Sequence, residues 1–165
     1  MVDVGRRFAH PRHGQIADAV LARAASSPEI TPRPRAELLR ALRHDRLVVA
    51  HDGDRVVGWF LSEPCGRGVH ELGFLFVDPS ARGDGVLLAL LDQALAIEPR
   101  AVSVTFRPDF ARWLIRARGF RRVTLATVTR ASRGRFLLRR LAPGRLGIAL
   151  RRTSGGEAWY LVHGA

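Results

Sequence analysis

The sequence lacks lysine and asparagine altogether, and it contains only one cysteine and one tyrosine among 165 residues. A single cysteine excludes an internal disulfide and a cysteine metal cluster, and Cys65 fits no nucleophile motif. No apolar run reaches the ~18 residues that a membrane-spanning helix needs, and the first residues lack the apolar core of a secretion signal. We therefore expect a cytoplasmic protein without a membrane span. We assign no metal, because the six histidines show no ligand spacing.

Since lysine is absent, all 27 basic residues are arginines, and the formal net charge is +12. Lysine and asparagine both have A-rich codons, so a GC-rich genome accounts for much of this arginine. Whatever the origin of the arginines, their positive electrostatic field attracts phosphates, acidic cofactors, nucleic acid and anionic membrane surfaces.

The excess positive charge is concentrated at the C-terminal end. Residues 130–165 contain eight arginines and one acidic residue. The stretch 133–141, RGRFLLRRL, is typical of a basic amphipathic helix, and a turn is expected after it at Pro143-Gly144. Such a helix could bind nucleic-acid phosphates, lie on an anionic membrane or form a homodimer contact. We favour a plainer interpretation, a solvated helix whose apolar side packs on a sheet.

The hydrophobic pattern predicts one α/β domain over residues 1–165, in which the basic segment 130–165 completes the sheet. Asp52-Gly53 is a strong tight-turn signal between two strands. Asp109 is expected to cap a helix and Gly119 to end it. We expect strands at residues 3–8, 47–50, 56–61, 69–77, 101–106, 121–129 and 159–163, and helices at residues 14–25, 36–42, 85–97, 109–118 and 132–141.

One strand-to-helix turn carries the strongest functional signal. The apolar strand 69–77 runs into Asp78-Pro79, then into the loop Arg82-Gly83-Asp84-Gly85, and then into an apolar helix. The first N–H groups of a helix have no internal partners, and glycines let backbone approach a phosphate closely. Arg82 adds a cation beside those donors. The pattern predicts a site for a phosphate-bearing cofactor, with an ordinary turn as the plain alternative.

Four patterns in this order resemble the GNAT superfamily of N-acetyltransferases, of which this chain looks like a divergent member. Val57-Gly58 before Trp59 resembles the family's second and third strands. The strand that ends in Val77-Asp78-Pro79 resembles its fourth, and the loop and helix start at 82–87 resemble its acetyl-CoA signature R/Q-x-x-G-x-G/A. Gly119-Phe120 resembles the end of its late helix. The resemblance covers about residues 3–129.

The resemblance implies a mixed, mostly antiparallel central sheet flanked by helices, here with a basic C-terminal extension. It implies transfer of an acyl group, most simply acetyl, from a CoA thioester to a primary amine by direct attack. Glu71 would be the catalytic base, and a backbone N–H of the fourth strand would polarise the thioester carbonyl. The pantetheine arm would lie beside Phe76 and Val77. The pyrophosphate would lie on the backbone of Arg82, Gly83, Asp84, Gly85, Val86 and Leu87.

Four positions depart from the family pattern. Leu87 replaces the last small residue of the signature, Asp84 puts a negative charge in the phosphate loop, and Pro108 replaces a frequent asparagine. Ile115 stands where many relatives carry the tyrosine that protonates the departing thiolate, and Tyr160 is far away in sequence. These departures favour an alternative: a catalytically decayed module that binds CoA, RNA or a protein partner. The sequence does not identify the amine acceptor.

Overall fold

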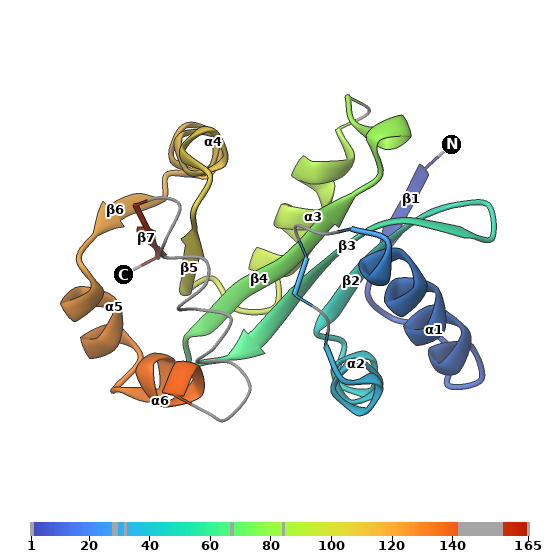
Figure 1. Ribbon diagram of the computed structural model, residues 1–165, viewed down its shortest axis with the longest axis horizontal. Coiled ribbons are helices and arrows are strands. Elements are labelled where there is room, and N and C mark those ends of the chain that lie inside the picture. The colour runs from blue at the N-terminus through green and yellow to red at the C-terminus, as the bar shows by residue number, and fades with distance from the viewer. Residues whose placement is uncertain are drawn as a thin grey trace. The chain divides into compact units, whose positions relative to one another are not determined.

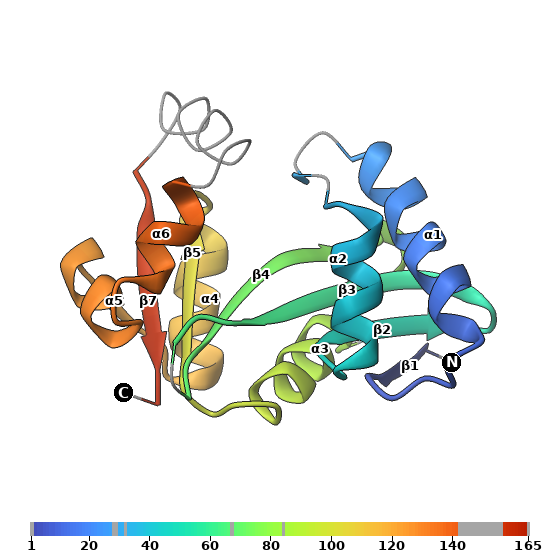
Figure 2. The same ribbon diagram turned by 90° about the horizontal axis from the view of Figure 1, so that it is seen from below.

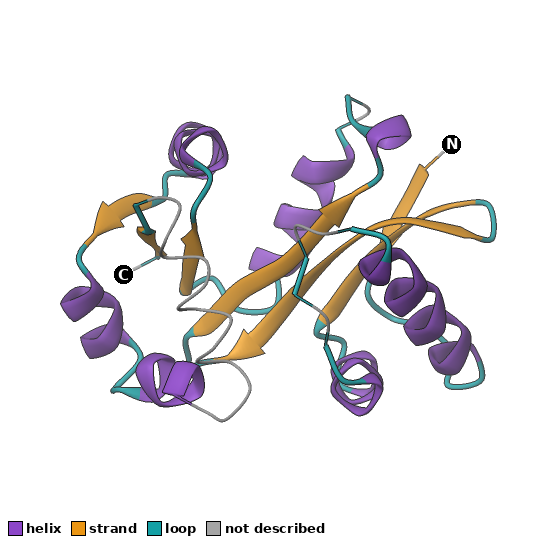
Figure 3. Ribbon diagram, viewed as in Figure 1, coloured by secondary structure: helices purple, strands orange, loops and turns teal. Residues whose placement is uncertain are grey.

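The computed structural model describes residues 2–27, 30–31, 33–66, 68–83, 85–141 and 157–164 of the chain. Among these residues, seven strands are hydrogen-bonded in the order β1-β2-β3-β4-β5-β7-β6, with helices packed against them (Figure 1, Figure 3). Strands β4 and β5 are parallel, whereas the pairs β1–β2, β2–β3, β5–β7 and β6–β7 are antiparallel. The predicted α/β fold with a mixed, mostly antiparallel sheet is confirmed.

The chain folds as two compact units, Met1–Glu63 with Gly73–Ile97 and Pro64–Leu72 with Glu98–Ala165. Strand β4 contributes residues to both of them. The elements, in chain order, are β1 (Val2–Gly5), α1 (Arg12–Ala25), α2 (Arg35–Arg43), β2 (Leu47–Asp52), β3 (Arg55–Pro64), β4 (His70–Val77), the 3-10 turn η1 (Pro79–Ala81), α3 (Val86–Leu95), β5 (Ala101–Thr105), α4 (Pro108–Arg118), β6 (Arg121–Val123), α5 (Leu125–Ala131), α6 (Arg135–Leu141) and β7 (Trp159–His163).

In the first unit, α1 and α2 cover one face of the strands and α3 covers the other (Figure 1, Figure 2). Helix α1 buries Ile16 and Val20, which lie one turn apart and so share a face. This face packs with α2 and with alternate residues of β2 and β3 in one hydrophobic core. On the opposite face, Gly58 lets α3 approach β3: a Cβ there would lie 3.3 Å from Leu90 and 3.0 Å from the Phe76 carbonyl.

In the second unit, α4 lies on one side of β5, β6 and β7, and α5 and α6 lie on the other (Figure 1). The terminal strand 159–163 was predicted correctly, and it lies between β5 and β6. Val128 of α5 and Phe136 of α6 are completely buried with Cys65, Val69 and Val162 in a second core. Cys65 is therefore a buried free thiol.

The prediction of one strand over residues 121–129 is wrong after Val123. Its β-branched residues are typical of a strand, but the Thr124 hydroxyl accepts a hydrogen bond from the Thr127 N–H at 3.3 Å and caps helix α5. A local cap thus overrides the β pattern. The helix expected at 132–141 begins only at Arg135, and the turn expected at 143–144 lies outside the described residues.

The prediction that Asp109 caps helix α4 is also wrong. The helix begins one residue earlier, at Pro108, and no side chain caps it. Proline suits the first helical position because its φ is already helical and it has no N–H to satisfy. Asp109 lies in the first turn and pairs instead with Arg112 at 2.5 Å. Gly119 ends the helix with φ 65°, as predicted.

None of the helices in the described part of the chain is long and apolar enough to cross a membrane.

Candidate functional site

The corner between β4 and α3 is held by Asp78. Its Oδ1 accepts hydrogen bonds from the Ser80 N–H at 3.0 Å and from the Ser80 hydroxyl at 2.8 Å, and so caps η1. Its Oδ2 pairs with Nη2 of Arg23, on α1, at 2.7 Å. Its own N–H donates to the Val57 carbonyl at 2.7 Å. A single residue thus joins β4 to β3, α1 and η1.

The hydrogen bonds from Ser80 lower the pKa of Asp78 below its ordinary value, and Arg23 lowers it further, against the opposing effect of burial. The carboxylate is therefore ionised at neutral pH and already engaged. We infer that Asp78 positions the loop that follows and does not face a ligand.

The loop after η1 is open and depends on two glycines. Gly83 has φ 113° and Gly85 has φ 71°, both in the region that side chains rarely adopt. A Cβ at either position would meet no atom within 4 Å. The glycines are therefore required by backbone conformation, not by crowding, and the space above the loop is free among the described residues. Asp84, which the sequence placed in this loop, lies outside the described residues.

The first turn of α3 presents backbone donors for which the described residues supply no helical partner. Its first helical hydrogen bond runs from the Ala89 N–H to the Gly85 carbonyl at 2.9 Å, so the N–H groups of Val86, Leu87 and Leu88 have no partner within the helix. No side chain of a described residue caps them. Together with the helix dipole they favour an anion.

Side chains around this turn differ in their exposure. Val86 is buried and Leu87 half-buried, so both would act through their backbone. Arg82 is exposed, and its Nε donates to the Val77 carbonyl at 3.3 Å. This contact holds the guanidinium beside the C-terminal end of β4. The structure therefore brings the Arg82 side chain to Val77, and α3 begins four residues after Arg82.

Strand β4 is irregular in its middle. Phe74 has φ 50°, which is uncommon for an aromatic residue and marks local strain. Its ring lies 5.6 Å from that of Trp59, and the Phe76 ring stacks on Trp59 at 4.6 Å. Phe76 is half-buried. Of the two expected pantetheine residues, Phe76 thus packs against a buried tryptophan of β3.

Glu71, the predicted base, lies near the start of β4, in the second unit. It is paired in parallel register with Val102 of β5 and is half-buried. The next pair, Leu72 with Ser103, is the last in the β4–β5 register, and the Ser103 hydroxyl donates to the Leu72 carbonyl at 3.1 Å. Glu71 therefore lies on the same strand as Phe76 and Val77, six residues before the strand ends.

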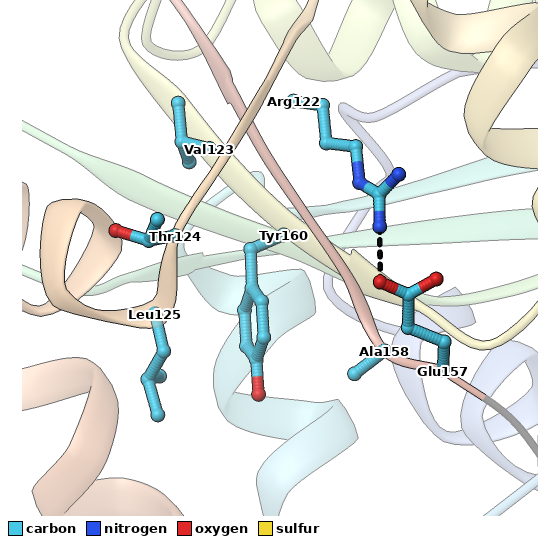
Figure 4. Close-up of a pocket in the computed structure, with 7 residues that line it drawn as sticks. All are labelled: Arg122, Val123, Thr124, Leu125, Glu157, Ala158 and Tyr160. Carbon is cyan, nitrogen blue, oxygen red and sulfur yellow. Dashed lines mark hydrogen bonds and ion pairs between the residues drawn. The ribbon is translucent and has the colours of Figure 1, made fainter.

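Ile115, which stands at the position of the family's tyrosine, and Tyr160, the one tyrosine of the sequence, lie on different elements. Ile115 is on α4, while Tyr160 is on β7 and packs edge-on against Phe136 of α6. Tyr160 lines a pocket of about 620 Å³ in the second unit (Figure 4). The pocket is lined by Arg122, Val123, Thr124, Leu125, Glu157, Ala158 and Tyr160. Sequence reasoning missed this pocket, because β6 and β7 are brought together only by folding.

Among the described residues, no group of three or more His, Cys, Asp or Glu side chains is placed to hold a metal ion.

Comparison with known proteins points to one family. The family model for the acetyltransferase (GNAT) family matches residues 17–106, more than half of the chain. A comparison with curated protein sequences found no match.

Among solved structures, the chain is similar to Rv2747 from Mycobacterium tuberculosis in complex with CoA and NLQ (19% identity, 98% of each chain covered, TM-score 0.65). It is also similar to Ard1 from Thermoplasma volcanium (16% identity, 98% and 96% covered, TM-score 0.64). A third is diaminobutyrate acetyltransferase EctA from Paenibacillus lautus in complex with L-2,4-diaminobutyric acid and coenzyme A (12% identity, 70% and 72% covered, TM-score 0.56). At these identities the likeness concerns the fold.

Proposed function

The chain belongs to the acetyltransferase (GNAT) family, and from that premise we propose that it transfers an acyl group, in the first instance acetyl, from acyl-CoA to a primary amine. The observation that carries the proposal is the open glycine loop before α3, with its three backbone donors free of helical partners. Two proteins of similar fold hold coenzyme A in their solved structures, which supports the choice of cofactor.

The cofactor residues act mainly through backbone. In this proposal the N–H groups of residues 82–87, Asp84 included, bind the pyrophosphate, and Arg82 contributes a cation. Phe76 and Val77 flank the pantetheine arm. The donor set fits an anion, because the helix start carries positive partial charge and the Gly83 and Gly85 positions leave room above it.

The chemical step needs few groups. Glu71 accepts the proton of the attacking amine, directly or through water. The amine nitrogen forms a bond to the thioester carbon, whose oxygen is polarised by a backbone N–H of β4, and the carbon–sulfur bond breaks. The departing thiolate takes a proton from water, because Ile115 occupies the position of the usual tyrosine. Catalysis then depends mostly on positioning the amine next to the thioester carbon.

Calorimetry with acetyl-CoA and an assay of released thiol across an amine panel test this function. We expect micromolar binding, and release of CoA that depends on the amine. Gly85→Glu should abolish binding, since a side chain and a negative charge would fill the anion site. Gly53→Glu is the matched control: Gly53 has φ 59° and open space around it, but it lies in the β2–β3 turn. An equal loss of acetyl-CoA affinity in both variants, or retained affinity in Gly85→Glu, would contradict the proposed anion site.

A second candidate is a family member that binds CoA without catalysis and acts through RNA or a protein partner. Ile115 at the tyrosine position favours it. The same experiment separates the two, because this candidate predicts binding of acetyl-CoA with no amine-dependent thiol release.

A further inference from the structure

Exposed apolar side chains are confined to one helix pair of the second unit. Among the described residues, three large apolar side chains are exposed: Leu125 at 39%, Leu137 at 39% and Leu138 at 68%. Leu125 begins α5, while Leu137 and Leu138 are consecutive residues of α6. A single exposed leucine needs no explanation, but adjacent ones indicate a surface that another molecule covers. We call Leu137 and Leu138 the leucine pair.

Helix α6 is held so that the leucine pair faces outward. Its Phe136 is completely buried and packs with Val128 in the second core. The Ser132 hydroxyl accepts from the Phe136 N–H at 3.2 Å and donates to the Thr129 carbonyl at 3.2 Å, which fixes the start of the helix. Two residues along an α-helix correspond to more than half a turn, so Leu138 lies opposite Phe136. A solvated helix packed on a sheet accounts for Phe136 but not for the leucine pair.

Arginines lie next to the leucine pair, and acidic residues do not. Residues 130–141 contain five arginines, and the sequence has neither Asp nor Glu from 110 to 156. Arg130, Arg133 and Arg135 are exposed. The Arg133 N–H donates to the Arg130 carbonyl at 3.0 Å, and α6 begins two residues later at Arg135, so these three residues lie in one tight turn. Cations beside exposed leucines are complementary to a lipid surface that has phosphates outside and acyl chains below them.

Two other partners suit this surface less well. Proteins that bind single-stranded nucleic acid stack bases on aromatic side chains, whereas the one aromatic ring of α6, Phe136, is completely buried. A second copy of the chain, joined through the same surface, would place arginines against arginines. An anionic bilayer makes use of both the apolar and the basic side chains.

We propose that the second unit binds anionic lipid bilayers through α6, with the leucine pair at the acyl-chain boundary and Arg130, Arg133 and Arg135 on the lipid phosphates. The contact is with one face of a bilayer. The inference does not rest on the proposed acyltransferase function, because it uses no residue of the proposed cofactor site.

Cosedimentation of the full chain with vesicles tests the apolar part of this contact. The vesicles are equimolar phosphatidylserine and phosphatidylcholine, or phosphatidylcholine alone, at about 0.15 M salt. We expect the double variant Leu137→Gln/Leu138→Gln to bind the anionic vesicles at least about tenfold more weakly than the wild type, because it loses apolar burial without a change of charge. Leu125→Gln, at an equally exposed leucine outside the pair, is the matched control and should change binding less than about twofold. Wild-type binding by the double variant, or equal binding of the wild type to both kinds of vesicle, would overturn the proposal.

A second pair of variants tests the position of the charge. Arg135→Gln should weaken binding to the anionic vesicles about fivefold, the usual effect of one basic residue near such a surface. Arg116→Gln removes the same charge from an exposed position on α4, which lies on the other side of the strands of this unit (Figure 1). It should weaken binding less than about twofold. An equal effect of both variants would mean that binding follows the net charge and not α6, which contradicts the proposal.

Two further outcomes would assign this surface to another partner. If single-stranded poly(U) RNA binds the chain and the anionic vesicles do not, the surface recognises nucleic acid. If the wild type is a dimer in analytical ultracentrifugation and the double leucine variant is a monomer, the surface joins two copies of the chain. Either result overturns the proposal. Thermal unfolding followed by circular dichroism confirms that each variant is folded before binding is compared.

Discussion

At the scale of single residues, two carboxylates on β4 and just after it have different surroundings. Asp78 accepts two hydrogen bonds from Ser80 and pairs with Arg23, which ties it to the scaffold. Glu71 is half-buried six residues before the end of the strand. A carboxylate with this many partners suits structural support, so Asp78 is not our candidate for moving a proton, and Glu71 remains the proposed base.

We expect Glu71→Gln to lower kcat about 100-fold, a typical effect of removing a general base. The affinity for acetyl-CoA should change by less than about twofold, since the amide keeps the shape of the side chain. Steady-state kinetics and calorimetry measure the two quantities. Glu98→Gln, the same change in the second unit outside the proposed site, is the control. Full activity of Glu71→Gln would remove this residue from the mechanism.

His51 of β2 predicts a pH effect on stability. Burial lowers its pKa below the ordinary 6.5, Arg12 lowers it further, and Asp3 and Asp54 act in the opposite sense. The unfolded chain therefore binds this proton more readily than the folded chain. The contribution of neutral His51 to stability is complete above pH 6.5, and it is lost as the pH falls through the folded-state pKa of this residue.

Among the residues that the structure describes, neither ring nitrogen of His51 has a hydrogen-bond partner, and the ring packs against Phe8 at 5.5 Å. We expect His51→Leu to remove this acid-dependent loss and to raise the free energy of unfolding at pH 7 by about 1 kcal/mol, because an unsatisfied polar group is replaced by an apolar one. Urea unfolding at pH 7.5 and at pH 5 measures both effects. His44→Leu, at an exposed histidine, should leave unchanged the difference between the free energies of unfolding at the two pH values.

At the scale of elements, the short segment after β6 illustrates how a cap decides between strand and helix. Thr124 has extended backbone, and its hydroxyl accepts from the Thr127 N–H, so that α5 begins at Leu125. This turn of the chain directs Val128 into the core with Phe136. Without the cap, the sequence from 121 to 129 favours a longer strand.

We expect Thr124→Ala to lower the free energy of unfolding by about 1 kcal/mol, the usual effect of losing an N-cap. Thr124→Ser should restore most of the loss, because serine provides the same acceptor. Urea unfolding followed by circular dichroism gives both values. Equal stability of the alanine and serine variants would show that the cap contributes nothing measurable.

At the scale of the whole molecule, the net charge of +12 sets a long-range field. Fields of this kind concentrate anionic ligands near the surface and weaken as salt screens them. The screening length falls from about 30 Å at 0.01 M salt to about 8 Å at 0.15 M. Binding of a cofactor with several phosphates should therefore depend on salt.

We expect the Kd for acetyl-CoA to rise at least about threefold between 0.01 M and 0.15 M salt, because screening weakens the long-range attraction. S-acetylpantetheine, which has no phosphate, should bind with a Kd that does not change over this range. Calorimetry at the two salt concentrations tests both ligands. The same salt dependence for both would mean that the effect does not come from phosphate attraction.

Local information in the sequence was sufficient for much of the fold. The Asp52-Gly53 turn signal between two apolar runs predicted the β2–β3 hairpin, and Gly119 predicted the end of α4. The family resemblance, carried by the 82–87 loop and its neighbours, is confirmed by the family model. Errors arose where two local signals compete, as at Thr124, or where a proline starts a helix earlier than the aspartate that follows it.

The sequence by itself determined the open turn before α3, for which we propose anion binding, because its glycines, arginine and helix start are consecutive and their geometry is local. Only the tertiary structure decided that the Arg33 guanidinium and the Trp59 ring both meet Phe74, and that β7 lies between β5 and β6. These relations join residues far apart in the chain. They follow from how helix and strand faces pack, which no short window of sequence specifies.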